Sequence, residues 1–143
     1  RFRMATRYAR NSFLIPEVKA HYEAVARMKR NTTPFGVAVG DFLSPVAITS
    51  VITRDYRGQV ADSIAITVND VFKVKMMKVI ITDANGGILE DGDATRVGNG
   101  SCFEYSCKCS IPDVEEVTIT VRVTDWPGNV VIEEVTNDKG LVT

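Results

Sequence analysis

The chain has 143 residues, 45% of them hydrophobic and 24% charged, which is typical of one folded domain with a terminal extension and excludes a disordered chain. No apolar run approaches the ~20 residues of a membrane-spanning helix, so we expect no membrane contact. The net charge of −1 is unevenly divided: residues 1–30 carry eight basic and two acidic residues, whereas the remainder carries nine basic and sixteen acidic ones.

Residues 1–44 are predicted to form a helical arm followed by a docking linker. Pro16 suits the first turn of a helix, and the apolar residues after it recur at the helical period until the helix fades after Arg30. A shorter helix is expected over residues 2–11. Residues 31–45 are expected to be the linker, because helix-breaking residues begin it and its aromatic residues are too apolar to remain in water.

From residue 45 onward hydrophobic and polar residues alternate, and this period of two predicts β-strands. No helical segment separates the strands, which excludes a parallel α/β sheet. The predicted strands cover residues 46–52, 63–68, 74–82, 88–94, 101–110, 117–124 and 130–135. The sequence therefore predicts a mainly β protein, a seven-stranded antiparallel β-sandwich preceded by an N-terminal α-helical segment, with residues 137–143 as a frayed tail.

Three groups of turn residues in this region resemble those of a known family. They are Asp83-x-Asn85-Gly86, Glu90-x-Gly92-x-Ala94 and Asp125-x-Pro127-Gly128-Asn129. Over residues 74–140 this arrangement is similar to bacterial immunoglobulin-like modules, and the resemblance covers about half of the chain. It implies an immunoglobulin-like sandwich over residues 45–136. The N-terminal helical part is not common to those modules, and turn motifs inform about fold more than about role.

The three cysteines are predicted to be free thiols. In a strand over residues 101–110, Cys107 and Cys109 lie on the same core-facing side about 7 Å apart, too far for an undistorted disulfide. Cys102 lies on the opposite face. Free thiols favour a reducing compartment, and the first ten residues lack the apolar run of a signal peptide, so we expect a cytoplasmic location.

The sequence contains no catalytic constellation, and we expect that the chain is not an enzyme. His21 is the only histidine and is far in sequence from all three thiols, so a hydrolase triad lacks its base. Gly98-Asn99-Gly100 is too short for a phosphate-binding loop. A structural zinc site needs four Cys or His ligands, and Cys107-x-Cys109 with the one histidine falls short of that set. We therefore expect no cofactor.

Calcium is the metal that the sequence supports best, because alternate loops of an antiparallel sandwich gather at one end. Asp70, Asp125 and Asn129 lie in such loops and carry the oxygen ligands that calcium prefers. Their spacing matches no defined calcium loop. The alternative, which we favour, is that these side chains cap turns by accepting hydrogen bonds from backbone N–H groups.

The basic N-terminus is the predicted partner surface. The candidate contact residues are Arg3, Arg7, Arg10, Tyr22 and Trp126, although we favour packing of Trp126 against the helix or the linker. Arginines could contact nucleic-acid phosphates, but the acidic remainder of the chain would repel them. We favour contact with an acidic protein surface, its own or that of a second subunit.

These observations favour a non-catalytic binding or assembly module that contacts a protein partner, or a second copy of itself, through the helical arm. The alternative is an accessory immunoglobulin-like domain of a larger surface or carbohydrate-active protein, which fold analogy implies. Nucleic-acid binding through the basic N-terminus is the less favoured reading.

Overall fold

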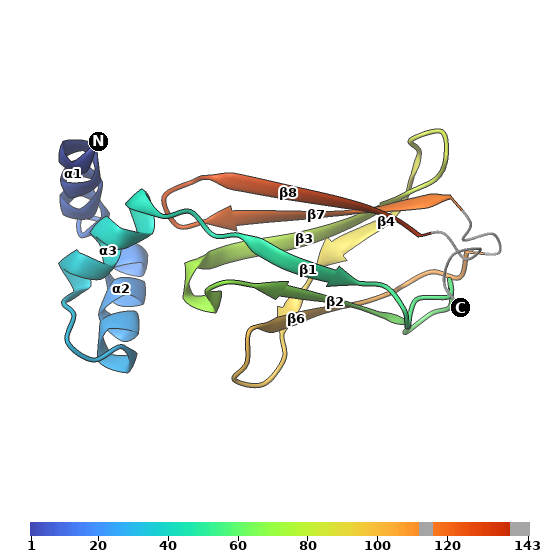
Figure 1. Cartoon of the computed structure of the whole chain (residues 1–143), viewed down its shortest axis with the longest axis horizontal. Helices are drawn as coiled ribbons and strands as arrows, with labels where there is room; N and C mark the ends of the chain where they lie inside the picture. The colour runs from blue at the N-terminus through green and yellow to red at the C-terminus, as the bar shows by residue number, and fades with distance from the viewer. Residues whose placement is uncertain (112–115, 138–143) are drawn as a thin grey trace. The chain divides into compact units, whose positions relative to one another are not determined.

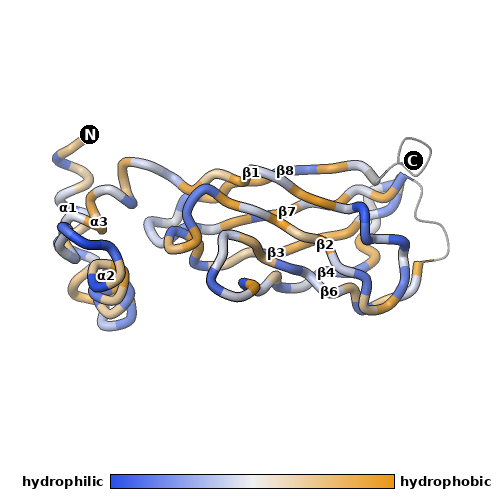
Figure 2. The backbone as a smooth tube through the Cα atoms, turned by 60° about the horizontal axis from the view of Figure 1, so that its bottom comes forward, coloured by the Kyte–Doolittle hydropathy of each residue, from blue (hydrophilic) through white to orange (hydrophobic). Residues whose placement is uncertain are grey.

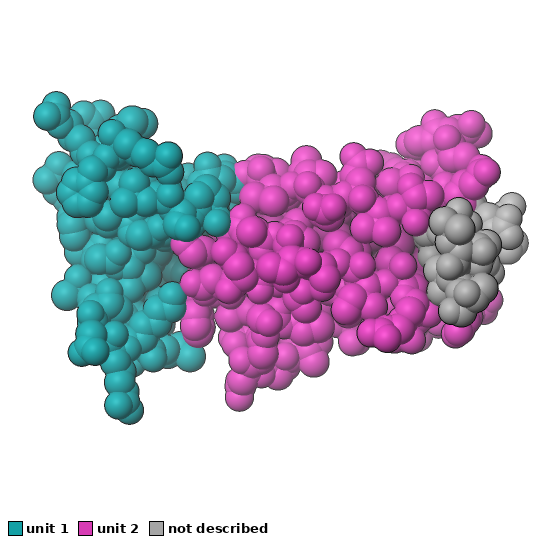
Figure 3. Space-filling view, viewed as in Figure 1, with its two compact units in different colours: residues 1–45, 125–129 teal, residues 46–124, 130–143 magenta. Residues whose placement is uncertain are grey.

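The computed structural model describes residues 1–111 and 116–137, and the chain divides into two compact units. The helical unit contains Arg1–Pro45 and Asp125–Asn129, and the strand unit contains Val46–Thr124 and Val130–Thr143 (Figure 3). The chain therefore contributes to the helical unit twice, once at its N-terminus and once between two strands.

The helical unit contains three helices in the part of the chain described. They are α1 (Phe2–Ser12), α2 (Pro16–Met28) and α3 (Pro34–Leu43). Helix α3 contradicts the prediction of a linker over residues 31–45. The Thr33 hydroxyl accepts a hydrogen bond from the backbone N–H of Gly36 at 3.0 Å, and Pro34 occupies the first helical position. Threonine followed by proline breaks the preceding helical pattern and also starts a new helix.

The strand unit contains eight strands within the described residues, one more than predicted. They are β1 (Ile48–Ile52), β2 (Ser63–Val68), β3 (Val74–Thr82), β4 (Ile88–Asp93), β5 (Thr95–Arg96), β6 (Cys102–Ser106), β7 (Val117–Asp125) and β8 (Val130–Asn137), with a 3-10 turn, η1 (Val71–Lys73), before β3. The additional strand is β5, whose two residues pair with Glu104 and Phe103 of β6. Two residues are too few to produce an alternating pattern, so periodicity alone cannot reveal this strand.

The strands form two four-stranded sheets, in the orders β1-β2-β6-β5 and β4-β3-β7-β8 (Figure 1). Within the first sheet, β2 pairs antiparallel with both β1 and β6. Within the second, β3–β4 and β7–β8 are antiparallel pairs. The chain passes from the second sheet to the first between β4 and β5. The result is a mainly β unit built from two antiparallel sheets.

One apolar core is shared by the two sheets, as in a β-sandwich. Ile64 and Ile66 of β2 and Ile119, Val121 and Val123 of β7 are all fully buried members of it. Figure 2 shows hydrophobic, orange segments along these strands. Strand β7 alternates strictly between buried and half-buried residues, which is the pattern of a strand with one face on a core. The apolar residues that alternate along the predicted strands are therefore the ones that form this core.

Strand β6 ends at Ser106, before the predicted end of the strand at residue 110. Cys107 is buried but Cys109 is exposed, so the prediction that both thiols face the core is wrong for Cys109. The alternation stops because the strand stops. The Cys107 backbone bonds instead to the loop before β2, since its N–H donates to Asp62 and its carbonyl accepts from Ala61, both at 2.8 Å.

Two further expectations concern the C-terminal part of the chain. Strand β8 continues to Asn137, two residues beyond the predicted end at residue 135. The tail expected over residues 137–143 lies outside the described residues from residue 138 onward.

Candidate functional site

Helix α1 has one buried face and one strongly basic face. Ala5 and Ala9 are fully buried, whereas Arg3, Arg7 and Arg10 are exposed. These arginines occupy positions i, i+4 and i+7, so they form one row about 10 Å long on the helix surface. Among the described residues, no hydrogen bond or ion pair engages their guanidinium groups. We call Arg3, Arg7 and Arg10 the arginine stripe.

A chain of buried hydroxyl and carboxyl groups fixes the inner side of α1. The Tyr22 hydroxyl donates to Asp41 Oδ2 at 2.7 Å, so it accepts from the Tyr8 hydroxyl, which lies 2.5 Å away. Tyr8 also stacks on Phe42 of α3, with ring centroids 5.5 Å apart. One residue from each helix takes part in this tyrosine–aspartate chain. Because an unpaired buried carboxylate is costly, these bonds fix the orientation of α1 and its stripe.

Tyr22 is therefore not a surface residue. It was a candidate for partner contact, but its side chain is fully buried and belongs to the core of the helical unit. Burial raises the pKa of Tyr8 to about 12, and burial with the hydrogen bond to Tyr8 and the nearby Asp41 raises the pKa of Tyr22 above its ordinary value. Both hydroxyls thus stay protonated at neutral pH and act as hydrogen-bond donors.

Trp126 packs inside the helical unit, against a helix, which is one of the two alternatives that the sequence favoured. Its ring stacks on His21 of α2, with centroids 3.9 Å apart and planes 18° apart. The half-buried indole is one of the residues that pack on the core around Ala9, Tyr22 and Ala38. Trp126 thus offers a partner only part of its surface.

Asp125 and Asn129, two of the calcium candidates, bond to each other and to their own turn. Asp125 Oδ1 accepts from the N–H groups of Gly128 at 3.0 Å and Asn129 at 2.7 Å, and Asp125 Oδ2 accepts from Asn129 Nδ2 at 3.0 Å. Gly128 has a φ of +102°, a conformation that favours glycine. This geometry closes the turn between β7 and β8, which is the capping role that the sequence favoured.

Asp70, the third calcium candidate, caps the 3-10 turn that precedes β3. Its Oδ1 accepts from the Phe72 N–H at 3.0 Å. Asn69 plays a similar part, because its Oδ1 accepts from the Ala47 N–H at 2.8 Å. Within residues 1–111 and 116–137, no group of three or more His, Cys, Asp or Glu side chains is placed to hold a metal ion.

The strand unit contains a buried carboxylate of its own, which sequence reasoning missed. Glu90 of β4 accepts from the Tyr105 hydroxyl at 2.6 Å and from the backbone N–H groups of Lys108 at 2.9 Å and Cys109 at 3.3 Å. It therefore ties the second sheet to β6 and to the segment after it. Burial raises the pKa of the neighbouring Cys107 thiol to about 12, so this cysteine remains a thiol at neutral pH.

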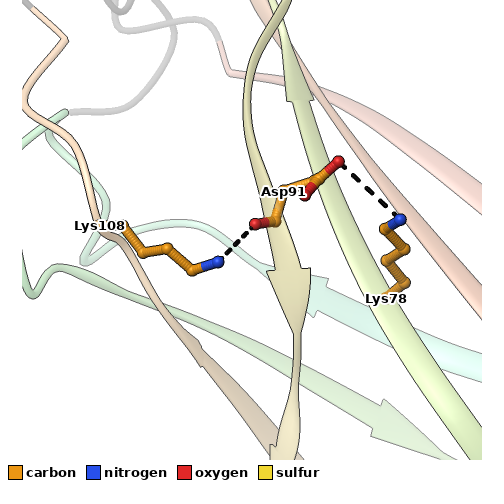
Figure 4. A network of polar contacts seen from close by, with 3 residues as sticks. All are labelled: Lys78, Asp91 and Lys108. Atoms are coloured by element: carbon orange, nitrogen blue, oxygen red, sulfur yellow. Dashed lines mark hydrogen bonds and ion pairs between the residues drawn. The ribbon is translucent and has the colours of Figure 1, made fainter.

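Two lysine side chains, Lys78 and Lys108, approach Asp91 of β4 from opposite sides of the strand (Figure 4). Lys108 Nζ donates to the Asp91 carbonyl at 2.7 Å, and Lys78 Nζ lies 3.8 Å from the Asp91 carboxylate. A Cβ atom on Gly92 would stand 2.7 Å from Lys108 Nζ, so glycine leaves room for the lysine to cross the strand. Both lysines thus have partners in the fold, unlike the arginine stripe.

The described helices do not include one that is both long and apolar enough to cross a membrane. The longest of them, α2, has only 13 residues.

Comparison with known proteins identifies no family: no family model matches the chain, and no curated protein matches it. Among solved structures, CopC from Methylosinus trichosporium OB3b is 14% identical with a TM-score of 0.47, covering 65% of this chain and 93% of its own. An engineered protein is 18% identical with a TM-score of 0.38, covering 64% of this chain and 19% of its own. Similarity at this level assigns neither family nor function.

Proposed function

We propose that the chain is a non-catalytic binding or assembly module, in which the helical unit contacts an acidic protein surface and the strand unit serves as the scaffold. The observation that carries this proposal is the arginine stripe. Three guanidinium groups without partners among the described residues share one face of a helix whose other face is fixed by buried hydrogen bonds.

Arginine suits a protein surface rich in carboxylates. Its planar guanidinium can form two parallel hydrogen bonds with one carboxylate, and it stays charged at any physiological pH. A rigid helix presents the three groups at fixed intervals, so less entropy is lost on binding than for a flexible basic tail. The acidic residues of the remaining chain disfavour nucleic acid as the partner.

The proposal includes no catalytic step. Cys107 has a raised pKa and a buried side chain, and both properties make it a poor nucleophile. The carboxylates of Glu90, Asp41 and Asp125 are all engaged in hydrogen bonds within the fold. These groups hold the protein together, which supports a structural rather than a chemical role for them.

We further propose that the strand unit is immunoglobulin-like. The orders β1-β2-β6-β5 and β4-β3-β7-β8 correspond to strands A-B-E-D and C′-C-F-G of that fold, in which β4 is the added edge strand. This correspondence also supports the alternative function, an accessory domain of a larger surface or carbohydrate-active protein. A melting temperature that rises in millimolar calcium would favour that alternative over a plain assembly module.

Charge reversal of the stripe tests the proposed function. We compare the full chain with a variant carrying Arg3→Glu, Arg7→Glu and Arg10→Glu in two assays, light scattering for self-association and pull-down for other protein partners. The matched control carries Lys19→Glu, Arg27→Glu and Arg30→Glu, three exposed residues of the same unit, so its net charge is identical.

We expect the stripe variant to lose the association that both the wild type and the control retain. The three glutamates of the variant would face the acidic surface of the partner. Repulsion between like charges should therefore weaken binding about a hundredfold or more. Equal binding by the stripe variant and the control would refute the arginine stripe as the contact surface.

A further inference from the structure

A glutamate occupies an inward-facing position on the edge strand β8. Glu133 pairs with Val121 of β7, while Val131 and Val135 on either side of it pair with Val123 and Ile119. Residues directly opposite in an antiparallel pair point to the same face of the sheet, and all three β7 partners are buried. Glu133 therefore carries a charge on the face where aliphatic side chains form the core. It remains exposed because β8 is the outer strand of its sheet.

A groove of about 130 Å³ lies where β8 meets β1, the outer strand of the other sheet. It is lined by the aliphatic residues Ile48, Val51 and Val135 and by Thr49, Ser50 and Glu133. The register of β1 against β2 shifts between Ile48 and Ser50. Because of this irregularity both Thr49 and Ser50 bond to the Thr67 hydroxyl, at 2.7 Å and 2.5 Å, on the outer face of the first sheet.

An inward-facing charge on an edge strand is known to prevent two sheets from joining edge to edge. That role explains why a charge is present, but it does not require a groove with aliphatic walls beside it. Those features match the chemistry of an arginine side chain. The Glu133 carboxylate can accept from the guanidinium, and aliphatic walls pack along its methylene stem. Among the described residues, no hydrogen bond or ion pair occupies the Glu133 carboxylate.

We infer that this groove receives Arg7, the central residue of the arginine stripe, from a second copy of the chain. The inference rests on the proposed function and names its partner. The helical unit has eight basic and four acidic residues and the strand unit nine basic and fourteen acidic, so the two kinds of surface attract between copies. Arg3 and Arg10, one turn to either side, add to the attraction for the acidic unit.

Assembly of this kind joins unlike surfaces, the stripe of one copy and the groove of the next. Such a contact closes into a ring or a pair if the rotation between copies allows it, and otherwise grows into an open chain. The protein then associates in a concentration-dependent and salt-sensitive manner, because the contact is formed by opposite charges at an accessible surface.

Sedimentation velocity on the full chain, over a series of protein concentrations, tests this inference. Glu133→Arg should raise the dissociation constant about tenfold or more, because it places a like charge opposite the stripe. Glu133→Gln, which cannot disturb the fold by repulsion, should raise it about threefold. The matched control is Glu134→Arg, the same charge change on the neighbouring exposed residue, whose side chain points to the opposite face.

The decisive variant combines Glu133→Arg with Arg7→Glu. Both sides of the contact are then exchanged, so we expect the double variant to recover association to within about threefold of the wild type, as a paired charge swap should. Each variant is first checked by its thermal melt against the wild type.

A wild type that stays monomeric, equal weakening by Glu133→Arg and Glu134→Arg, or a double variant that stays dissociated would each overturn the inference. A monomeric wild type that still binds another protein through the stripe would leave the proposed function intact. If the triple arginine variant keeps every association of the wild type, the proposed function itself fails.

Discussion

The two units of this protein keep their structures by different physical means. The core of the strand unit is built from aliphatic side chains such as Ile64, Ile119 and Val121, all fully buried. The core of the helical unit has few large aliphatic residues and instead buries alanines together with Tyr22 and Asp41. The stability of the strand unit should therefore depend mainly on buried apolar area, and that of the helical unit on its buried hydrogen bonds.

The largest effect is expected from a cavity in the aliphatic core. Ile119→Ala removes a fully buried side chain of β7 and should lower the free energy of unfolding by about 3 kcal/mol. Thr120→Ala, the next residue on the half-buried outer face, should change it by less than about 0.5 kcal/mol. Urea denaturation, monitored by far-ultraviolet circular dichroism, measures the free energy of unfolding of both variants. Equal losses would contradict the assigned faces of β7.

A smaller loss is expected from one hydroxyl in the helical unit. Tyr22→Phe removes the donor to Asp41 and leaves a buried carboxylate without that bond, which should cost about 2 kcal/mol. Hydrogen exchange at the α1 amides is the measurement, since the effect is local to this unit. Tyr8→Phe, which removes only the outer hydroxyl, is the control and should cost about 1 kcal/mol. If neither variant changed the hydrogen exchange of α1, the buried hydrogen bonds would not stabilise the helical unit. The proposed contrast with the aliphatic core of the strand unit would then be wrong.

Alkaline pH should lower the stability of both units. Cys107 has a pKa raised to about 12 from 9.0, and Tyr8 has one raised to about 12 from 10.0. The folded protein thus holds these protons more tightly than the unfolded chain. Their stabilising effect is complete below about pH 9 and is lost as pH rises toward 12. We expect the free energy of unfolding to fall steadily above pH 9, and Cys107→Ala to delay the start of that fall. A constant value from pH 8 to 11 would contradict the burial of these groups.

The smallest effect is a gain in stability at one strained position of the strand unit. Ala61 has a φ of +74°, which a residue with a Cβ atom rarely adopts. Ala61→Gly should raise the free energy of unfolding by about 0.5 kcal/mol because it relieves this strain. Ala65→Gly in β2, at an ordinary strand position, should lower it. Thermal melts of the two variants should move in opposite directions.

Much of the strand unit could be predicted from alternation, and much of the helical unit could not. Period-two burial located seven of the strands because long runs such as residues 117–124 repeat one pattern many times. Strand β5 was missed because it has only two residues. Helix α3 was missed because Thr33-Pro34 serves equally well as the end of one helix and the start of another.

The candidate site was predictable in part. The sequence named Arg3, Arg7 and Arg10 as basic residues of the N-terminus, and the structure exposes them on one helix, whereas their role in partner contact stays a prediction. It also named Tyr22, which is buried instead, because no local pattern shows that Asp41, 19 residues away, accepts a hydrogen bond from its hydroxyl. The inward position of Glu133 depends on pairing with β7, which a single strand does not reveal. Contacts between distant segments are thus the part that sequence periodicity leaves open.

The central claim is that the arginine stripe is the contact surface, and covalent labelling tests it most directly. The full chain is treated with an arginine-specific dicarbonyl reagent when dilute and when assembled, and each site is quantified by mass spectrometry. The account predicts that Arg3, Arg7 and Arg10 become protected on assembly, while exposed Arg27 and Arg30 are labelled equally in both states. Unchanged labelling of the stripe, or protection of Arg27 and Arg30 instead, would contradict it.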